Sequence, residues 1–457
     1  MTNLMILAAG LGTRMKSRRA KVLHELAGRP LISYAIRAAI ATEPENILVV
    51  VGYQAEDVER AARETAERSG HAPNLWFMLQ AEQRGTGHAV MSARKWLQER
   101  SSRLVVMAGD VPMIKGGTLK QLIDKHVSER NDATILTVLM DDPTGYGRII
   151  KDPEGRFIRS VEQRDATREE LKLREVNVSL YCFETAPLVA ALDRLTIDNA
   201  QGEYYLTDVP EIMLRDGKRV GIFLHGNADE VTGINTRVEL AALERMLRER
   251  KLHELMLSGV TIIDPASTYV HQDVEIGPDT VLHPQVTIEG ASCIGSDCTI
   301  RSWTRLRNVS VGDGVTINDS CVIEETSIRD GARVGPFSRL RMQADIGEGA
   351  VIGNFVEVKK SGIGRGTKAQ HLSYLGDATL GDNVNIGAGT VTCNYDGKHK
   401  HQTHIEDDVK IGSDTMLVAP VRVGKGSVTG AGSVVTRDVP PDSLVVGVPA
   451  SVKKRLK

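Results

Sequence analysis

The chain has 457 residues, of which 41% are hydrophobic and 25% charged, and its formal net charge is −2. This length exceeds what one hydrophobic core usually supports, so we expect two or more domains. The near-neutral charge, without a long run of one sign, gives no support for a nucleic-acid-binding or membrane-bound protein. Aromatic residues make up only 4%, which indicates that part of the chain packs aliphatic side chains in repeated layers.

The N-terminus carries a short apolar run, residues 4–9, with no basic residue ahead of it. The run is too short to span a membrane and lacks the charged region of a signal peptide, so we interpret it as a buried strand. The five cysteines include no CxxC pair. Their odd number and spacing argue against disulfides or a zinc site and predict a cytoplasmic location.

Residues 1–229 alternate apolar runs of strand length with segments of helical spacing. The predicted strands include 4–7, 47–51 and 104–107, and the predicted helices include 31–40 and 57–68. This alternation indicates βαβ units and a Rossmann-like α/β domain with a parallel sheet covered by helices. Ligands of such sheets bind at the carboxyl ends of the strands.

The loop after the first strand has the residues of a phosphate-binding turn. Glycines let a phosphate approach backbone N–H groups, and an arginine adds a planar fork of donors. Met15 stands where a dinucleotide-binding fingerprint needs its third glycine, and no Gly-Lys-Ser/Thr follows, which excludes a P-loop. We therefore predict a turn that holds a triphosphate, formed by Leu7, Ala8, Ala9, Gly10, Gly12, Arg14 and Lys21.

Asp110, just beyond the predicted strand 104–107, is the best candidate for a magnesium ligand. Its carboxylate is a hard oxygen ligand, and it lies where such sheets bind substrates. An aspartate that only caps a loop would look the same in the sequence.

Residues 230–250 are predicted to form a helical linker. Thr236 and Glu239 have the spacing of a capping box, in which each side chain satisfies the other residue's backbone amide. Leu243 and Leu247 recur on one helical face, and Gly259 can end the segment.

Residues 251–457 follow another pattern, in which an aliphatic residue is followed by glycine. Several gaps are multiples of six, as between Gly347 and Gly353. This hexapeptide repeat predicts a left-handed parallel β-helix, with the aliphatic residue pointing inward and the small residue at the turn. The aliphatic positions are Ile276, Ile294, Val311, Val334, Ile346, Ile352, Ile363, Leu380, Ile386, Ile411 and Val423.

Several segments together resemble known enzymes. LAAGLGTRM (7–15), LQAEQRGTGHAV (79–90) and AGDVPM (108–113) are similar to sugar-1-phosphate nucleotidylyltransferases. GNFVEVKK (353–360), KAQHLSYLGD (368–377) and NIGAGTVTCNYDG (385–397) are similar to a hexapeptide-repeat acetyltransferase core. The combination covers nearly the whole chain and resembles the bifunctional GlmU family.

The resemblance implies a two-site enzyme of UDP-N-acetylglucosamine synthesis, a precursor of peptidoglycan and lipopolysaccharide. It acetylates glucosamine 1-phosphate with acetyl-CoA and then transfers UMP from UTP to N-acetylglucosamine 1-phosphate, which releases pyrophosphate. It also implies a cytoplasmic homotrimer with Mg²⁺ as cofactor, small-molecule substrates, and neither a nucleic-acid partner nor membrane insertion.

The family's motifs also imply roles for individual residues. In the N-terminal half, Arg14 and Lys21 contact the phosphates and Asn235 joins Asp110 on the metal. Gln80, Gly85 and Thr86 would contact the uracil, and Gly147, Glu162 and Asn177 would contact the sugar. Ala20 stands where the family usually has a proline before the lysine.

In the C-terminal half the resemblance makes His371 the general base, because an amine attacking a thioester must lose a proton near neutral pH. Glu357 would orient or polarise it. The sugar phosphate is assigned to Arg341, Lys359 and Tyr374, the sugar to Asn385 and Asn394, and the acetyl region to Tyr395. The backbone N–H of Ala388 would stabilise the thioester oxygen, and Ser413 and Ala431 would contact coenzyme A.

Alternatives remain at this point. The β-helix could serve only for assembly, beside an active nucleotidylyltransferase, or the chain could be a binding or structural protein. A single histidine is more often structural, and His399, His401 and His404 admit a less favoured metal-binding interpretation. The family's late arginine is replaced by Gly447-Val448-Pro449, so that either Lys453, Lys454 or Arg455 contacts the phosphates of coenzyme A or this contact is weaker.

Overall fold

The computed structural model describes residues 2–70, 74–100 and 102–455. The chain divides into two compact units, Met1–Leu243 and Glu244–Lys457. None of the described helices combines the length and hydropathy that a segment crossing a bilayer would need.

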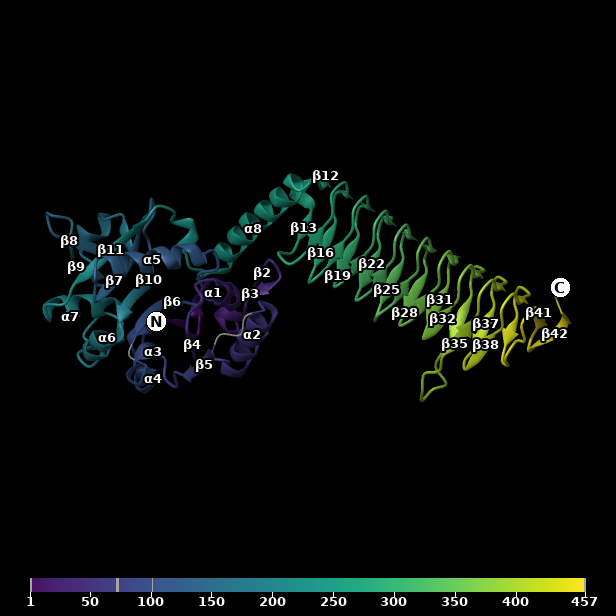
Figure 1. The fold of residues 1–457 in the computed structure, drawn as a ribbon, viewed down its shortest axis with the longest axis horizontal. Coiled ribbons are helices and arrows are strands. Elements are labelled where there is room, and N and C mark those ends of the chain that lie inside the picture. Colours follow the sequence, from purple (N-terminus) through teal and green to yellow (C-terminus); the bar gives the residue numbers. More distant parts are fainter. Residues whose placement is uncertain (1, 71–73, 101, 456–457) are drawn as a thin grey trace. The chain divides into compact units, whose positions relative to one another are not determined.

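A mixed β-sheet forms the centre of the N-terminal unit (Figure 1), with the strand order β11-β7-β10-β6-β1-β4-β5. The three predicted strands are confirmed as β1, β4 and β6, which pair in parallel. The bounds are β1 (Thr2–Ala8), β4 (Asn46–Val51), β5 (Asn74–Leu79), β6 (Arg103–Ala108), β7 (Ala133–Leu139), β10 (Glu175–Glu184) and β11 (Val220–His225).

Helices cover both faces of this sheet because its strands are apolar on both sides. Alternate residues of β1 enter two separate cores: Ile6 packs in one and Met5 in the other. One core includes α1 (Leu31–Ile40), α2 (Ala55–Arg68) and α5 (Gly116–Ser128). The other includes α3 (Thr86–Ser92), α4 (Arg94–Glu99), α6 (Thr185–Leu192) and α7 (Val209–Arg215). The predicted helices 31–40 and 57–68 are confirmed as α1 and α2.

The sheet is not parallel throughout, although the sequence pattern predicts a parallel sheet. Strand β10 runs antiparallel to both β6 and β7. It also pairs with β8 (Gly147–Lys151), which forms an antiparallel ladder with β9 (Phe157–Val161). An apolar run has the same composition in either direction, so strand direction cannot be derived from it.

Helix α8 (Arg237–Leu257) follows the N-terminal sheet in the chain. Its capping box is confirmed: the Thr236 amide donates to Glu239 Oε2 at 3.1 Å, and the Glu239 amide donates to Thr236 Oγ1 at 3.2 Å. Leu243 and Leu247 are buried. Gly259, with φ +98°, follows the helix end.

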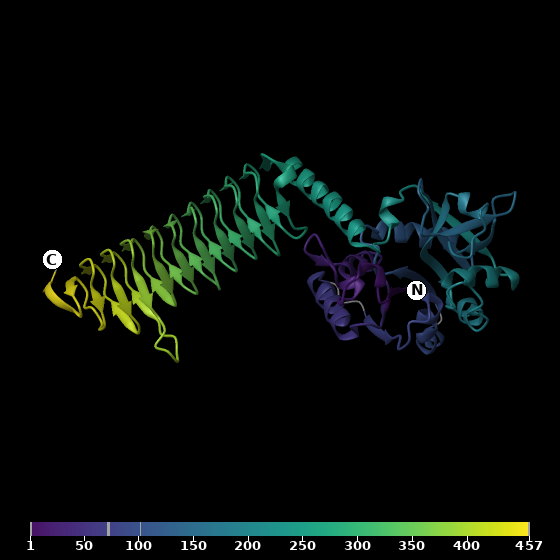
Figure 2. The same cartoon turned by 180° about the vertical axis from the view of Figure 1, so that it is seen from behind.

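The C-terminal unit is a parallel β-helix of stacked coils (Figure 2). Its short strands form three sheets, which start at β12 (Thr261–Ile262), β13 (Tyr269–Val270) and β14 (Glu275–Ile276). The eleven aliphatic residues of the repeat are all buried in one core. The hexapeptide interpretation is therefore confirmed, and the stacked aliphatic layers account for the low aromatic content.

One insertion interrupts the coils of this β-helix. Between β34 (Val391–Cys393) and β35 (Thr403–Ile405) the chain leaves the stack in a loop, which projects from it in both views (Figures 1 and 2). A bridge between Tyr395 and Lys400 closes this loop.

Candidate active sites

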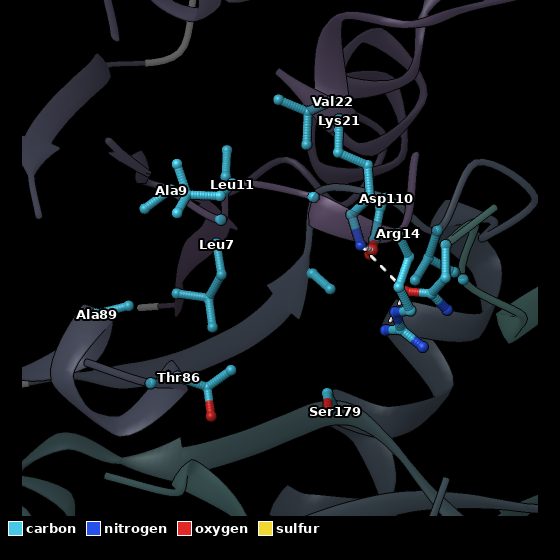
Figure 3. Close-up of a pocket in the computed structure, with 18 of the residues that line it drawn as sticks. Leu7, Ala9, Leu11, Arg14, Lys21, Val22, Thr86, Ala89, Asp110 and Ser179 are labelled. Atoms are coloured by element: carbon cyan, nitrogen blue, oxygen red, sulfur yellow. Dashed lines mark hydrogen bonds and ion pairs between the residues drawn. The ribbon is translucent and has the colours of Figure 1, made fainter. Parts of the chain in front are cut away.

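A cavity of about 510 Å³ lies at the carboxyl ends of β1 and β6. Leu7, Ala9 and Leu11 of the first strand and its loop form one side of it, and Thr86 after β5 and Ser179 within β10 contribute to its wall (Figure 3). Every N-terminal site residue predicted from the sequence lines this cavity: Leu7, Ala8, Ala9, Gly10, Gly12, Arg14, Lys21, Gln80, Gly85, Thr86, Asp110, Gly147, Glu162, Asn177 and Asn235.

Gly12 shapes the loop that approaches the phosphate-binding candidates. Its φ is +62°, and a Cβ at this position would lie 2.6 Å from Lys21 Cβ. Only glycine satisfies both the backbone conformation and this close approach. The glycine thus lets the lysine side chain cross the loop toward the strand ends.

Two cations and two oxygen-bearing side chains meet at this edge of the sheet. Lys21 Nζ forms an ion pair with Asp110 Oδ2 and lies 3.3 Å from Asn235 Oδ1 (Figure 3). Arg14 Nη2 donates to the same Asn235 oxygen at 2.7 Å. The oxygens of Asp110 and Asn235 are therefore close enough to share one cation. Among the described residues, no group of three or more His, Cys, Asp or Glu side chains forms a metal site.

Gln80 is buried at another part of the cavity wall. Its amide nitrogen donates to the Gly85 carbonyl at 3.1 Å and lies 3.2 Å from His88 Nδ1. Gly85 has φ +104°, and a Cβ there would lie 2.5 Å from the Tyr204 carbonyl oxygen. The GTG segment therefore packs too closely for a larger residue at its first position.

The opposite wall presents polar groups from β10 and its neighbours. A register shift in β10 between Asn177 and Tyr181 turns the chain at Ser179, whose φ is +57°. Asn177 donates to Ser160 Oγ at 3.2 Å and accepts from the Ser179 amide at 2.9 Å. Glu162 accepts from Thr207 Oγ1 at 3.1 Å, and burial raises the pKa of its carboxyl above the ordinary value.

Some cavity residues were not singled out from the sequence. Tyr146, Ser179 and Glu203 also line the cavity. All three lie inside segments that also resemble the family, DDPTGYGRI (141–149), EVNVSLY (175–181) and NAQGEYYLTD (199–208), so a signal existed for each. Ser179 faces the cavity because of the β10 register shift, which sequence periodicity does not reveal.

In the β-helix, five residues occupy the same position of successive coils. Asn354 pairs in register with His371. In the next coils the strands stay in register, with pairs such as Ile386↔Ile411 and Lys410↔Val428. The residue two places after each strand's inward residue therefore stacks on its equivalent in the next coil. The position passes through Asn354, His371, Ala388, Ser413 and Ala431. Backbone bonds link its later members: Asp414 N donates to Ala388 O at 2.7 Å and Gly432 N to Ser413 O at 2.8 Å. The predicted base, the residue predicted to stabilise the thioester oxygen and two predicted coenzyme A contacts thus form one column.

The neighbouring sheet carries the residues predicted to hold the sugar phosphate. Arg341 pairs in register with Lys359, and Glu357 with Tyr374. They lie on β25 (Arg339–Arg341), β28 (Glu357–Lys359) and β31 (Tyr374–Gly376). Glu357 Oε1 binds Arg341, at 2.7 Å from Nε and 2.6 Å from Nη2.

The ring of His371 is hydrogen-bonded to Asn354 and not to Glu357, the partner expected from the sequence. Its Nδ1 lies 3.0 Å from Asn354 Oδ1, whereas Glu357 binds Arg341. Asn354 was not predicted as a site residue. Its place directly opposite His371 follows from coil stacking, which separates them by one coil.

A buried polar group lies next to these residues. Asn394 donates to Asp377 Oδ2 at 2.6 Å and lies 3.5 Å from Tyr374 Oη. Lys359 is buried, and its proximity lowers the pKa of Lys400 on the projecting loop. The loop thus places a second amine close to Lys359.

The remaining predicted residues lie around this group. Asn385 is exposed on β33 (Asn385–Ile386), in register with Lys368. Tyr395, on the loop, is also exposed, and its hydroxyl donates to the Gly397 carbonyl at 2.7 Å. His401 Nε2 lies 2.7 Å from Asp396 Oδ2 within the loop. The histidine–aspartate contact ties the base of the loop together.

Comparisons with known proteins match both parts of the chain to transferase families. The nucleotidyl transferase family matches residues 3–229, and the bacterial transferase hexapeptide family matches residues 402–437. A bifunctional protein GlmU of Syntrophomonas wolfei is 47% identical over 97% of this chain and 96% of its own. Bifunctional GlmU proteins of a Geobacillus species and of Pelobacter propionicus are 44% and 46% identical, over 98% and 97% of this chain and 96% and 95% of theirs. The chain belongs to the bifunctional GlmU family.

Proposed function

We propose that the two activities of this bifunctional enzyme are divided between the two ends of the chain. Residues 1–229 carry uridylyl transfer, 230–250 form the linker, and 251–457 carry acetyl transfer. The enzyme acetylates glucosamine 1-phosphate with acetyl-CoA and then joins UMP from UTP to N-acetylglucosamine 1-phosphate. The assignment of the first activity is supported by the cavity that gathers all its predicted residues.

Uridylyl transfer needs positioning more than proton transfer. A sugar 1-phosphate, with a second pKa of about 6, is already a dianion near neutral pH. Its oxygen attacks the α-phosphorus of UTP, and pyrophosphate leaves. Arg14 and Lys21 neutralise charge on the phosphates, and the backbone N–H groups of the first loop hold them. Gln80, Gly85 and Thr86 contact the uracil, and Gly147, Glu162 and Asn177 the sugar.

Asp110 and Asn235 are the residues that would hold Mg²⁺. Their oxygens meet around one positive charge, the Lys21 ammonium group, and carboxylate and amide oxygens suit this hard ion. When bound, Mg²⁺ offsets negative charge on the triphosphate. With Asp110 and Asn235 engaged by the ion, Lys21 would be free to contact the phosphates.

Acetyl transfer needs a base. His371 Nε2 takes the proton of the sugar amine as its nitrogen attacks the thioester carbon. The N–H of Ala388 stabilises the developing oxyanion, and the C–S bond then breaks to release the thiol. Glu357 orders Arg341, which with Lys359 and Tyr374 holds the sugar phosphate. The other contacts are Asn385 and Asn394 to the sugar, and Tyr395, Ser413 and Ala431 to acetyl-CoA.

We further place the enzyme in the cytoplasm as a homotrimer. All five cysteines are free thiols, which supports a reducing compartment. An exposed column on the β-helix has Trp303, Phe337, Phe355 and Leu372 at equivalent positions of its coils, with Ser320 between the first two, and it supports assembly. Leu372 follows His371 directly, so a second copy seated there would lie beside the acetyl site.

Reciprocal variants test the division of activities. Asp110→Ala should abolish pyrophosphate release from UTP and leave acetyl transfer nearly intact. His371→Ala should lower coenzyme A thiol release by about 10²–10⁴-fold and leave uridylyl transfer of supplied N-acetylglucosamine 1-phosphate unchanged. Asp124→Ala and His404→Ala, both exposed in wild type, are the controls. Equal loss of both activities in either site variant would contradict the division, and a His371→Ala enzyme that still acetylates would refute the base.

A further inference from the structure

Asn354 and His371 are held against each other by two independent contacts. Their strands, β27 (Val351–Asn354) and β30 (Lys368–His371), are neighbours in one parallel sheet, and the two residues pair in register. The Leu372 amide donates to the Asn354 carbonyl at 3.1 Å. Side chains add the bond between Asn354 Oδ1 and His371 Nδ1 at 3.0 Å. Both the backbone and the ring of His371 are therefore located by one residue of the preceding coil.

We propose that Asn354 is a positioning residue that fixes the tautomer of His371. This inference rests on the proposed role of His371 as the base. An amide oxygen only accepts hydrogen bonds, so His371 Nδ1 must carry a proton when it binds Asn354 Oδ1. In a neutral imidazole the lone pair is then on Nε2. Nε2, the nitrogen that must receive the substrate proton, is thus kept unprotonated and lies on the side of the ring opposite the bond to Asn354.

The role falls to Asn354 because Glu357 is engaged elsewhere. The Glu357 carboxylate binds Arg341 through two guanidinium nitrogens. A neutral amide also suits this base better than a carboxylate does. A carboxylate stabilises imidazolium and so favours the protonated form, whereas an amide sets the tautomer without adding charge.

The proton then follows a balanced path. The neutral amine nitrogen forms a bond to the thioester carbon and gives one proton to His371 Nε2. The proton on His371 Nδ1 meanwhile stays hydrogen-bonded to Asn354 Oδ1. The C–S bond breaks, and the leaving thiolate takes that proton back from Nε2. His371 ends in the tautomer in which it began, so Asn354 holds the ring throughout the cycle.

Three variants of the full-length enzyme test the proposal. Asn354→Ala should lower kcat of acetyl transfer by about 10–100-fold, typical of a lost orienting partner, with little change in KM for either substrate. Asn354→Asp should restore much of the rate, with the acid limb of the pH profile moved to higher pH, because a carboxylate favours imidazolium. Asn318→Ala is the matched control. It also removes a bond between coils, from Asn318 Nδ2 to the Gly335 carbonyl at 3.3 Å, and should keep the wild-type rate.

A measurement on the ring itself separates this role from the catalytic one. Nitrogen-15 NMR of the substrate-free enzyme, with His371→Gln to identify the signals, should show Nδ1–H in wild type. In Asn354→Ala the Nε2–H tautomer should become populated. An unchanged tautomer in that variant, or a change caused instead by Glu357→Gln, would overturn the proposal. If His371→Ala still acetylates, the base assignment fails, and the tautomer shift alone then decides what Asn354 does.

Discussion

Glycines of the hexapeptide repeat are required where two coils touch. A Cβ built on Gly364 would lie 2.2 Å from the Gly381 carbonyl oxygen in the next coil. Two positions earlier, Gly362 has open space around its Cβ position. Neither residue has a positive φ. The same amino acid is thus demanded by packing at one position and only tolerated at the other.

This contrast predicts different stabilities for two alanine variants. Gly364→Ala should lower the stability of the β-helix by about 1–3 kcal/mol, the usual cost of overpacking. Gly362→Ala should stay within about 0.5 kcal/mol of wild type. Chemical unfolding of the β-helix, followed by circular dichroism, measures both. Equal effects would show that the close approach of the two coils at Gly364 does not limit packing.

At the scale of elements, the start of α8 connects helix formation to the uridylyl site. Glu239 Oε2 accepts from the Thr236 amide and, at 2.6 Å, from the amide of Asn235. Asn235 is the second candidate metal ligand. One capping carboxylate therefore both starts the helix and fixes the backbone that carries this ligand.

Removal of this cap should affect stability and metal use together. Glu239→Ala should cost about 0.5–2 kcal/mol, as a lost N-terminal cap does, and should raise the Mg²⁺ concentration needed for half-maximal uridylyl transfer. Acetyl transfer should not change. Glu249→Ala, on an exposed position of the same helix, controls for charge. An unaltered Mg²⁺ dependence in Glu239→Ala would separate the cap from the metal site.

At the scale of the whole molecule, the β-helix exposes apolar side chains in an unusual backbone state. Phe337 and Phe355 are 53% and 56% exposed, and their rings stack at 5.4 Å. They and Trp303 and Leu372 all have positive φ, a conformation that bulky residues rarely adopt. Contact of these apolar side chains with water is unfavourable, whereas their burial against another copy of the chain would be favourable.

We therefore expect a trimer whose assembly depends on this column. Sedimentation should give a trimer for wild type and a smaller species for Phe337→Ser combined with Phe355→Ser. The double variant should lose acetyl transfer and keep uridylyl transfer. Ile263→Ser, at a residue of equal exposure, 53%, should remain trimeric. A wild-type monomer at micromolar concentration with full acetyl transfer would contradict the expectation.

The sequence alone determined the two architectures, because each is built from a local repeat. Alternating apolar and helical segments specify the sheet with its helices, and the eleven buried aliphatic residues specify the β-helix. The phosphate loop was also readable, since Gly12 and Lys21 are near in sequence. The chain's membership of its family followed from the same segments.

Only the tertiary structure decided the direction of β10 and the partner of His371. Strand β10 runs antiparallel to β6 and β7, and an apolar run has the same composition in either direction. Asn354 and His371 are 17 residues apart, and their contact exists only because one coil stacks on the next. Local sequence patterns predict which residues are buried and which elements form. The contacts between residues far apart in the sequence depend on how those elements pack.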